Sequence, residues 1–301
     1  MSEPQSPGTT LPLTSRRRLL KLLPLGALLT ACGGAAATPV PTTAPRPTSI
    51  PTSIPTPAPT PEPKELVLMV ASSLTDAFNE MGVEFPRLAG NEGVKFTPSY
   101  GASTMLRTQL EQGAPADLFA AADTIQMDMA VKAGVIVGTP KIFVRNRLTV
   151  IVPKNNPAGV NALVDLAKPR LKFVTTAPDV PVGNYTRQAL TKMAAEAQFG
   201  VGFDQKVLAN VVSEEANVRQ VVTKVQLGEA DAGVCYVSDV TPASAPALTM
   251  IEIPDQFNTI AEYPIALTKN AKAPATALRF ITYVSSAAGQ GILKKNNFIP
   301  A

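Results

Sequence analysis

Strand-like apolar runs alternate with amphipathic, helix-like stretches from residue 65 onward. Three strand-then-helix pairs come first, at 65–71 with 73–90, 94–101 with 103–113, and 117–122 with 124–134. Strands that alternate with helices in this way are typical of α/β folds. The pattern therefore predicts an α/β architecture for this part of the chain.

A second series of such segments begins at residue 147. Its apolar runs lie at 147–154, 162–168, 172–177, 206–212 and 232–238, with helices predicted at 184–198 and 218–227. A strand over 264–270 and one amphipathic helix over 275–296 complete the pattern. Because residues 65–301 exceed what one ordinary core holds, we expect two α/β lobes.

Four predicted helix starts carry residues that suit an anion. Ser73 is followed three positions later by Asp76, as in a capping box, and Ser103 is preceded by Tyr100-Gly101-Ala102. In the second series Pro181 opens a helix and Asn217 stands as an N-cap. Ordinary capping would explain any one of these starts. Together they predict donor groups from both halves, because the first helical turn has open N–H groups and a positive dipole end.

The first 31 residues read as an export signal. A basic segment, SRRRLLK, precedes a short apolar run at 22–29 that is too short for an ordinary membrane span, and the basic segment resembles a twin-arginine signal. The following Leu-Thr-Ala-Cys resembles the lipobox of bacterial lipoproteins, which would make Cys32 a lipid-modified anchor. The alternative is an unmodified signal peptide with an incidental cysteine.

Residues 32–64 are rich in proline and threonine and have no apolar periodicity. Such sequence favours an extended polyproline II conformation with about 3.1 Å per residue, which predicts a semi-stiff tether on the order of 100 Å long.

Charge and composition narrow the function of residues 65–301. Of the net charge of +4, residues 1–64 hold six basic and two acidic side chains, which leaves 21 of each sign in residues 65–301. A nucleic-acid partner would require a basic excess, so none is expected. The chain has no histidine, which excludes Ser-His-Asp and Cys-His catalysis and most transition-metal cation sites. Cys235 lies in an apolar run and reads as a small buried hydrophobe more readily than as a reactive thiol.

Longer motifs carry a specific resemblance. They are VASSLTDAF (70–78), QLEQGAPADLFAAAD (109–123), NRLTVIVPK (146–154), DVPVGNYTRQAL (179–190), ANVRQVV (216–222), GEADAGVCYVSD (228–239) and EYPIAL (262–267). In order and spacing they resemble the molybdate-binding proteins of ABC-type molybdate uptake systems, over essentially all of residues 65–301. The resemblance implies a two-lobed type II periplasmic-binding-protein fold with the ligand cleft between the lobes. Lobe 1 would comprise 65–147 plus 239–301, and lobe 2 would comprise 148–238.

The resemblance also implies the ligand residues. Ser73 and Ser103 would each offer a hydroxyl and a backbone N–H, Val182 and Val218 a backbone N–H, and Tyr236 its hydroxyl. All five would hold the molybdate oxyanion through hydrogen bonds and none would ligate the metal directly. The sequence departs from the family pattern at Ser72 and Val182, where alanine is usual, and in the segment GASTMLRTQ (101–109).

The implied function is an extracytoplasmic, lipid-anchored, monomeric receptor. It would need no resident cofactor and would not be an enzyme. It would capture molybdate, and tungstate as well, and deliver it to a membrane-embedded ABC permease. The chemistry agrees, since a fully deprotonated oxyanion needs donors only, whereas protonated phosphate also needs an acceptor.

Several alternatives remain open at this point. The ligand could be another oxyanion, with cavity size separating sulfate from molybdate and tungstate. A zwitterionic amino acid would need a carboxylate, which the proposed shell lacks. An enzyme would use Ser73 or Cys235 as nucleophile, without a base that the sequence identifies. Arg219 could be a counter-ion to the ligand or, as we expect, an arginine that is solvated or stabilises the lobes.

Overall fold

A computed structural model of the protein describes residues 65–301. The predicted signal segment 1–31, the lipidation residue Cys32 and the tether 32–64 lie outside this range. Within it, no helix combines the length and the apolar character that crossing a bilayer would require.

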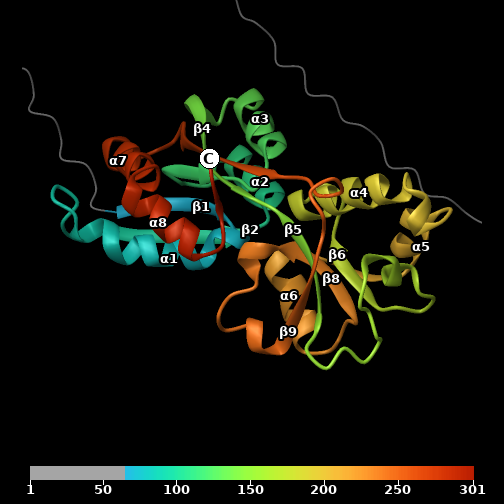
Figure 1. The fold of residues 1–301 in the computed structure, drawn as a ribbon. Coiled ribbons are helices and arrows are strands. Elements are labelled where there is room, and N and C mark those ends of the chain that lie inside the picture. Colours follow the sequence, from blue (N-terminus) through green and yellow to red (C-terminus); the bar gives the residue numbers. More distant parts are fainter. Residues whose placement is uncertain (1–64) are drawn as a thin grey trace, which may run out of the picture. The chain divides into compact units, whose positions relative to one another are not determined.

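The first sheet has six strands in the order β11-β4-β10-β3-β1-β2. Figure 1 labels β1, β2 and β4 of this sheet. β1 pairs in parallel with β2 and β3, and β10 runs antiparallel to β3 and β4. We call this sheet and its helices lobe 1. The strands are β1 (Glu65–Ala71), β2 (Lys95–Gly101), β3 (Leu118–Ala120), β4 (Ile136–Asn146), β10 (Ala261–Thr268) and β11 (Ile299–Pro300). The helices are η1 (Ser72–Leu74), α1 (Thr75–Glu84), η2 (Phe85–Arg87), α2 (Ser103–Glu111), α3 (Thr124–Lys132), α7 (Pro274–Val284) and α8 (Ala287–Lys295).

The second sheet has five strands in the order β7-β6-β8-β5-β9. β6 is parallel to β7 and β8, and β5 is antiparallel to β8 and β9. We call this sheet and its helices lobe 2. The strands are β5 (Leu148–Pro153), β6 (Phe173–Thr176), β7 (Val211–Glu215), β8 (Ala232–Tyr236) and β9 (Leu248–Glu252). The helices are η3 (Leu163–Ala167), α4 (Pro181–Ala194), η4 (Ala197–Phe199), α5 (Phe203–Ala209), α6 (Val218–Gln226), η5 (Val237–Asp239) and η6 (Ala245–Ala247).

The side chains of β1 point alternately to the two faces of its sheet, as the two-residue period of a strand requires. Leu66, Leu68 and Val70 pack into the main core, whereas Met69 packs into a separate cluster with Leu106 of α2 and other apolar side chains. Both faces are thus covered by helices. This explains why the run is almost continuously apolar.

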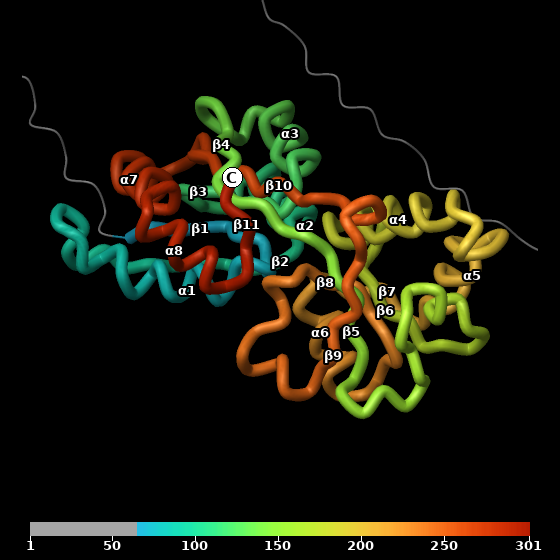
Figure 2. Tube along the Cα trace, in the orientation of Figure 1, coloured from blue at the N-terminus to red at the C-terminus, as the bar shows by residue number. Residues whose placement is uncertain are grey.

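The chain passes between the sheets twice, from β4 into β5 and back from β9 into β10, and the two connections can be followed in Figure 2. The buried Asn258 joins them, because its side-chain carbonyl accepts from Leu148 N and its amide donates to Leu148 O, at 3.0 and 2.9 Å. An asparagine therefore pairs with the first strand after the crossing much as a neighbouring strand would.

The structure differs from the sequence pattern at several points. Two of the predicted apolar runs are not strands, since 162–168 contains η3 and 206–212 begins with the end of α5 before β7 starts. β4 was not anticipated, because residues 136–142 are mostly exposed or half-buried and lack a clear apolar face. β9 lies in the second sheet although its residues fall within the predicted lobe 1 range of 239–301, so the return to lobe 1 follows residue 252. The predicted helix 275–296 is divided into α7 and α8, because the Ser286 side chain caps a new helix by accepting from Gly289 N.

An aromatic cluster forms the centre of lobe 1. Phe280 of α7 makes an edge contact with Phe85 at a centroid distance of 5.1 Å and lies 5.6 Å from Phe78 and 5.2 Å from Phe96. Its side chain is fully buried. Rings at such separations add to the stabilisation that burial alone provides.

We therefore expect Phe280→Ala to lower the free energy of unfolding by about 3–5 kcal/mol, the usual cost of deleting a buried ring. The measurement is urea unfolding at neutral pH. Leu278→Ala is the matched control, since Leu278 lies on the same helix and is 53% exposed; it should cost far less. Equal losses in the two variants would contradict the assigned core.

Candidate ligand-binding site

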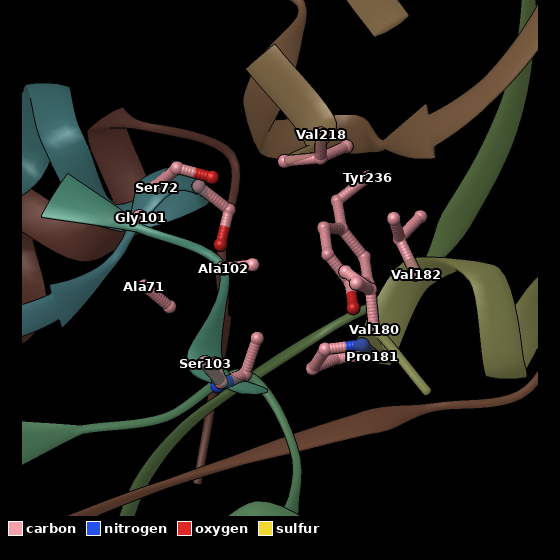
Figure 3. Close-up of a pocket in the computed structure, with 12 residues that line it drawn as sticks. Ala71, Ser72, Gly101, Ala102, Ser103, Val180, Pro181, Val182, Val218 and Tyr236 are labelled. Atoms are coloured by element: carbon pink, nitrogen blue, oxygen red, sulfur yellow. The ribbon is translucent and has the colours of Figure 1, made fainter. Parts of the chain in front are cut away.

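One pocket is lined by residues from both lobes (Figure 3). All five residues that the sequence nominated lie around it, namely Ser73, Ser103, Val182, Val218 and Tyr236. The other lining residues are Ala71, Ser72, Gly101, Ala102, Ala122, Val180 and Pro181. The fold therefore brings together positions that are up to 163 residues apart in the chain.

Strand pairing explains why the two serine motifs meet. β1 and β2 are parallel neighbours whose last pair is Ala71 opposite Gly101. Ser73 and Ser103 each follow two residues later, so both emerge at the same edge of the sheet. The same rule acts in lobe 2, where the parallel strands β6, β7 and β8 lead to Val182, Val218 and Tyr236. Ligands of open α/β sheets bind at this carboxyl edge of the strands.

Main-chain donors at the pocket are open. The N-caps of α2 and α4 are Ala102 and Val180, neither of which supplies a side-chain cap. In the described residues the backbone N–H groups of Ser103 and Val182 donate to no protein acceptor, and the same holds for Ser73 and Val218. Four open N–H groups in a nearly buried space call for an acceptor.

Asn217 and Gly183 fit this arrangement. Asn217 is the N-cap of α6, as predicted, and its side chain accepts from Arg219 N and Gln220 N, which leaves Val218 N uncapped. A Cβ at Gly183 would lie only 2.4 Å from Thr176 O, so glycine allows the first turn of α4 to pack against the end of β6. The starts of α6 and α4 are therefore held in place while the N–H groups of Val218 and Val182 keep no protein acceptor.

The two serines do not cap helices as the sequence suggested. Ser73 lies within η1, and its Oγ is 2.9 Å from the hydroxyl of Tyr263, while Ser103 Oγ accepts from Ala122 N at 2.9 Å. The capping box with Asp76 is also wrong. Neither Ser73 nor the actual N-cap of α1, Leu74, makes a cap hydrogen bond through its side chain. Both hydroxyls are held by other partners at the pocket.

Tyr236 supplies a further polar atom. It is 1% exposed, and its hydroxyl has no hydrogen-bond partner in the described part of the chain. Burial strongly raises the pKa of this phenol, so the group keeps its proton. A buried hydroxyl without a partner is costly unless a ligand accepts from it.

Arg219 joins the lobes beside the pocket but does not line it. From α6 it donates to Asp76 Oδ2 at 2.6 Å and through Nε to Ser72 O at 3.2 Å, both in lobe 1. Nε also lies 3.1 Å from Asp239 Oδ1. Burial would lower the pKa of Arg219, but the carboxylates of Asp239 and Asp76 outweigh this effect and raise it. The charge is thus neutralised within the protein, which favours the lobe-stabilising interpretation over a counter-ion.

A second polar contact between the lobes lies near the start of α4. Thr104 Oγ1 of α2 donates to Asp179 O at 2.7 Å, and Gln126 Nε2 of α3 donates to the same carbonyl at 3.2 Å. Polar contacts thus join the two lobes both near the start of α4 and around Arg219. The structure therefore shows the two lobes closed over the pocket.

The cavity is small. It measures about 20 Å³, on a scale where a single water molecule needs at least about 10–15 Å³. On that scale the cavity has room for about one or two water molecules. No carboxylate is among the lining residues, and no cluster of three or more metal-ligating side chains occurs in residues 65–301.

Sequence reasoning missed Tyr263 and Asn146. Tyr263 lies in the motif EYPIAL, but nothing in that motif indicates that its hydroxyl reaches a serine 190 positions away. Cys235, the other nucleophile candidate, is fully buried, and burial raises the pKa of its thiol well above the usual value. A buried neutral thiol is a structural residue rather than a nucleophile.

The fold and the site define a class of protein that holds a small ion between two α/β lobes. Residues 66–299 match the family model of the bacterial extracellular solute-binding proteins. The molybdate-binding protein ModA of Mycobacterium tuberculosis is 38% identical over 235 residues, covering 78% of this chain and 84% of the relative. YvgL of Bacillus subtilis, whose provisional name is ABC transporter substrate-binding lipoprotein, is 28% identical and covers 77% of this chain and 85% of the relative.

Solved structures agree on the fold. The periplasmic molybdate-binding protein of Azotobacter vinelandii superposes with a TM-score of 0.67 at 19% identity, covering 78% of this chain and 99% of that chain. The sulfate-binding protein SubI of Mycobacterium tuberculosis gives 0.70 at 20% identity, covering 79% and 87%. The chain belongs to the bacterial extracellular solute-binding proteins and, within them, to the family of the molybdate-binding protein ModA. The resemblance identified in the sequence is thereby confirmed.

The buried Asp239 predicts a pH dependence of stability. Burial raises the pKa of this carboxyl to about 6, whereas in an unfolded chain it is about 3.9. The folded protein therefore holds this proton more tightly, and the resulting stabilisation is lost as the pH rises through 6. Between pH 7 and pH 5 the free energy of unfolding of the wild type should rise by about 1 kcal/mol relative to Asp239→Asn.

Urea unfolding of both proteins at pH 7, 6 and 5 measures this difference. Asp255→Asn is the control, because the Asp255 carboxylate is exposed and contacts only the edge of lobe 2 through Arg147. A wild-type-to-Asp239→Asn difference that stays constant across the three pH values would contradict the assigned ionisation of Asp239.

Proposed function

We propose that this protein captures molybdate outside the cytoplasm and delivers it to an ABC transporter, with the five pocket residues as the ligand shell. The observation that carries the proposal is the shell itself, which combines donors from both lobes and contains no acidic side chain. Ser73 and Ser103 each offer a hydroxyl and a backbone N–H. Val182 and Val218 offer backbone N–H groups, and Tyr236 offers its unpartnered hydroxyl.

The charge of the ligand follows from this chemistry. Open N–H groups at helix starts stabilise an anion without a formal positive charge, and a buried donor that lacks a partner is costly. Molybdate carries no proton near neutral pH, so it can accept from every donor and needs no acceptor in return. Membership of the ModA family and the molybdate named for its relatives support this choice.

Other ligands and activities have less support. Hydrogen phosphate would require an acceptor for its proton, and the ammonium of an amino acid would require a carboxylate; the lining residues provide neither a carboxylate nor a free carboxamide oxygen. Sulfate shares the charge and shape of molybdate, and the fold likeness to a sulfate-binding protein keeps it as the second candidate. For an enzyme, Ser73 would need a base, but the hydroxyl beside it belongs to the buried Tyr263.

Closure of the two lobes would accompany binding. Only the closed form presents the lobe 1 donors Ser73 and Ser103 and the lobe 2 donors Val182, Val218 and Tyr236 to one ion, so the ion favours that form. The contacts of Arg219 with Asp76 and Ser72 O add protein interactions to the same state.

The anchoring and delivery steps belong to the same proposal. Cys32 would carry the lipid after cleavage of the twin-arginine-like signal peptide, and residues 32–64 would tether the lobes to the membrane beside the permease. The lipobox-like sequence and the lipoprotein name of YvgL support this localisation. The protein would act as a monomer, with the predicted lobes of 65–147 plus 239–301 and of 148–238, except that residues 239–252, which include η6 and β9, belong to lobe 2.

The direct test is calorimetric titration of the protein with molybdate. We expect saturable binding at one site, and we expect Ser73→Ala and Ser103→Ala each to weaken it about tenfold or more, the usual loss for a hydrogen bond to a charged group. Ser285→Ala is the matched control, since its hydroxyl bonds to Ile281 O at the end of α7. Unchanged affinity in both pocket variants, with melting temperatures near that of the wild type, would contradict the site.

The contribution of closure is tested through Asp76→Asn. This change removes the carboxylate that pairs with Arg219 across the lobes, and the pair is partly exposed. We therefore expect molybdate affinity to fall by about two- to fivefold, as for a surface ion pair. Glu80→Gln should leave the affinity unchanged, because Glu80 pairs with Lys295 within lobe 1. Equal molybdate affinities for the wild type, Asp76→Asn and Glu80→Gln would show that the Arg219–Asp76 pair does not contribute to closure of the lobes.

A further inference from the structure

A chain of buried hydrogen bonds runs from the lobe crossing to the pocket. Asn146, the last residue of β4, donates through Nδ2 to Ser238 Oγ at 2.8 Å and to the Tyr263 hydroxyl at 3.3 Å. The Tyr263 hydroxyl lies 2.9 Å from Ser73 Oγ. Asn146 and Tyr263 are fully buried, and Ser73 and Ser238 are nearly so. Water therefore has little access to exchange with these bonds.

The direction of this chain is determined by its first member. Asn146 Oδ1 accepts from Arg147 N at 3.0 Å, which identifies the other terminal atom as the NH₂ group. An NH₂ group can only donate, so the Tyr263 oxygen accepts from it. The single hydrogen of this buried hydroxyl then has a partner only if it points to the Ser73 oxygen. Ser73 Oγ is its hydrogen-bond partner. Ser73 thus accepts from Tyr263, and its own hydrogen remains for the pocket.

We propose that Tyr263, oriented by Asn146, is a positioning residue that directs the hydrogen of the Ser73 hydroxyl toward the ligand and thereby favours oxyanions that carry no proton. This inference deepens the proposed function and rests on it. A protonated oxyanion would need an acceptor where the pocket presents a hydrogen, whereas a fully deprotonated one meets no such conflict. Tyr263 itself does not line the pocket, so it acts through Ser73.

The second serine is arranged in the same way by an independent donor. Ser103 Oγ accepts from the backbone N–H of Ala122 at 2.9 Å, which leaves its hydrogen for the pocket. Only proline would remove this main-chain donor, and it would also restrict the backbone, whereas Tyr263→Phe removes the Tyr263 hydroxyl alone. The contact between Tyr263 and Ser73 can therefore be used to test whether the pocket distinguishes protonated from deprotonated oxyanions.

Tyr263 is also held firmly enough to be a reliable donor. Its ring makes edge contacts with Tyr236 at a centroid distance of 5.9 Å and with Phe298 at 5.6 Å. Burial raises the pKa of the phenol well above its usual value, which keeps the proton in place across the physiological range. Tyr263→Phe retains the ring and these contacts and removes only the hydroxyl.

The experiment compares wild type, Tyr263→Phe, Ser73→Ala and the double variant by calorimetry with molybdate, and by competition of phosphate and sulfate against molybdate. Sulfate and phosphate are of similar size, but at pH 7 only phosphate is protonated. We expect Tyr263→Phe to weaken molybdate binding about three- to tenfold and to improve phosphate relative to sulfate as a competitor. In the Ser73→Ala background the same change should have no further effect on affinity, because the two residues act as one unit.

Tyr283→Phe is the matched control, since Tyr283 packs its ring against Phe85 and Phe280 in lobe 1, away from the pocket. An unaltered phosphate-to-sulfate ratio in Tyr263→Phe, or an additive loss of affinity in the double variant, would overturn the inference. A wild type that fails to bind molybdate would instead refute the proposed function. Melting temperatures of all variants separate these results from a loss of fold.

Discussion

The structure depends on one constraint, that a doubly charged ion can leave water only where enough hydrogen-bond donors replace its hydration. In this pocket the proposed donors are main-chain N–H groups at the starts of helical segments and the hydroxyls of Ser73, Ser103 and Tyr236, and none of the lining side chains is charged. The neighbouring charges neutralise one another outside the pocket, where Arg219 is paired with Asp76 and Asp239. In the proposed function the site would attract an anion through oriented dipoles, and this depends on the position of each helix start.

Much of this arrangement could be predicted from the sequence. β1 has the predicted bounds, and the α/β alternation identified the two parallel strand ends that bring Ser73 and Ser103 to one edge. The helix starts at Pro181 and Asn217 followed from local motifs, whereas the family resemblance implied Val182 and Val218 as the donors. Local sequence specifies helix starts well, because capping and proline at the first turn act over a few residues.

What could not be predicted depends on contacts distant in sequence. Asp76 pairs with Arg219, 143 residues away, and Ser73 contacts Tyr263, 190 residues away. The local sequence cannot show these distant partners, so it suggested a capping box instead. β9 and the break between α7 and α8 were missed for a related reason. β9 forms because it pairs with β5, and the helix breaks because Ser286 caps α8. Neither feature changes the apolar periodicity of the sequence enough to be recognised.

The central claim is that the pocket is a donor-only shell for a fully deprotonated tetrahedral oxyanion of the size of molybdate. Its most direct test is parallel calorimetric titration of the protein with molybdate, tungstate, sulfate and phosphate at pH 7. The account predicts tight binding of molybdate and tungstate, weaker binding of sulfate and the weakest binding of phosphate. Saturable binding of phosphate in the absence of molybdate binding would contradict it.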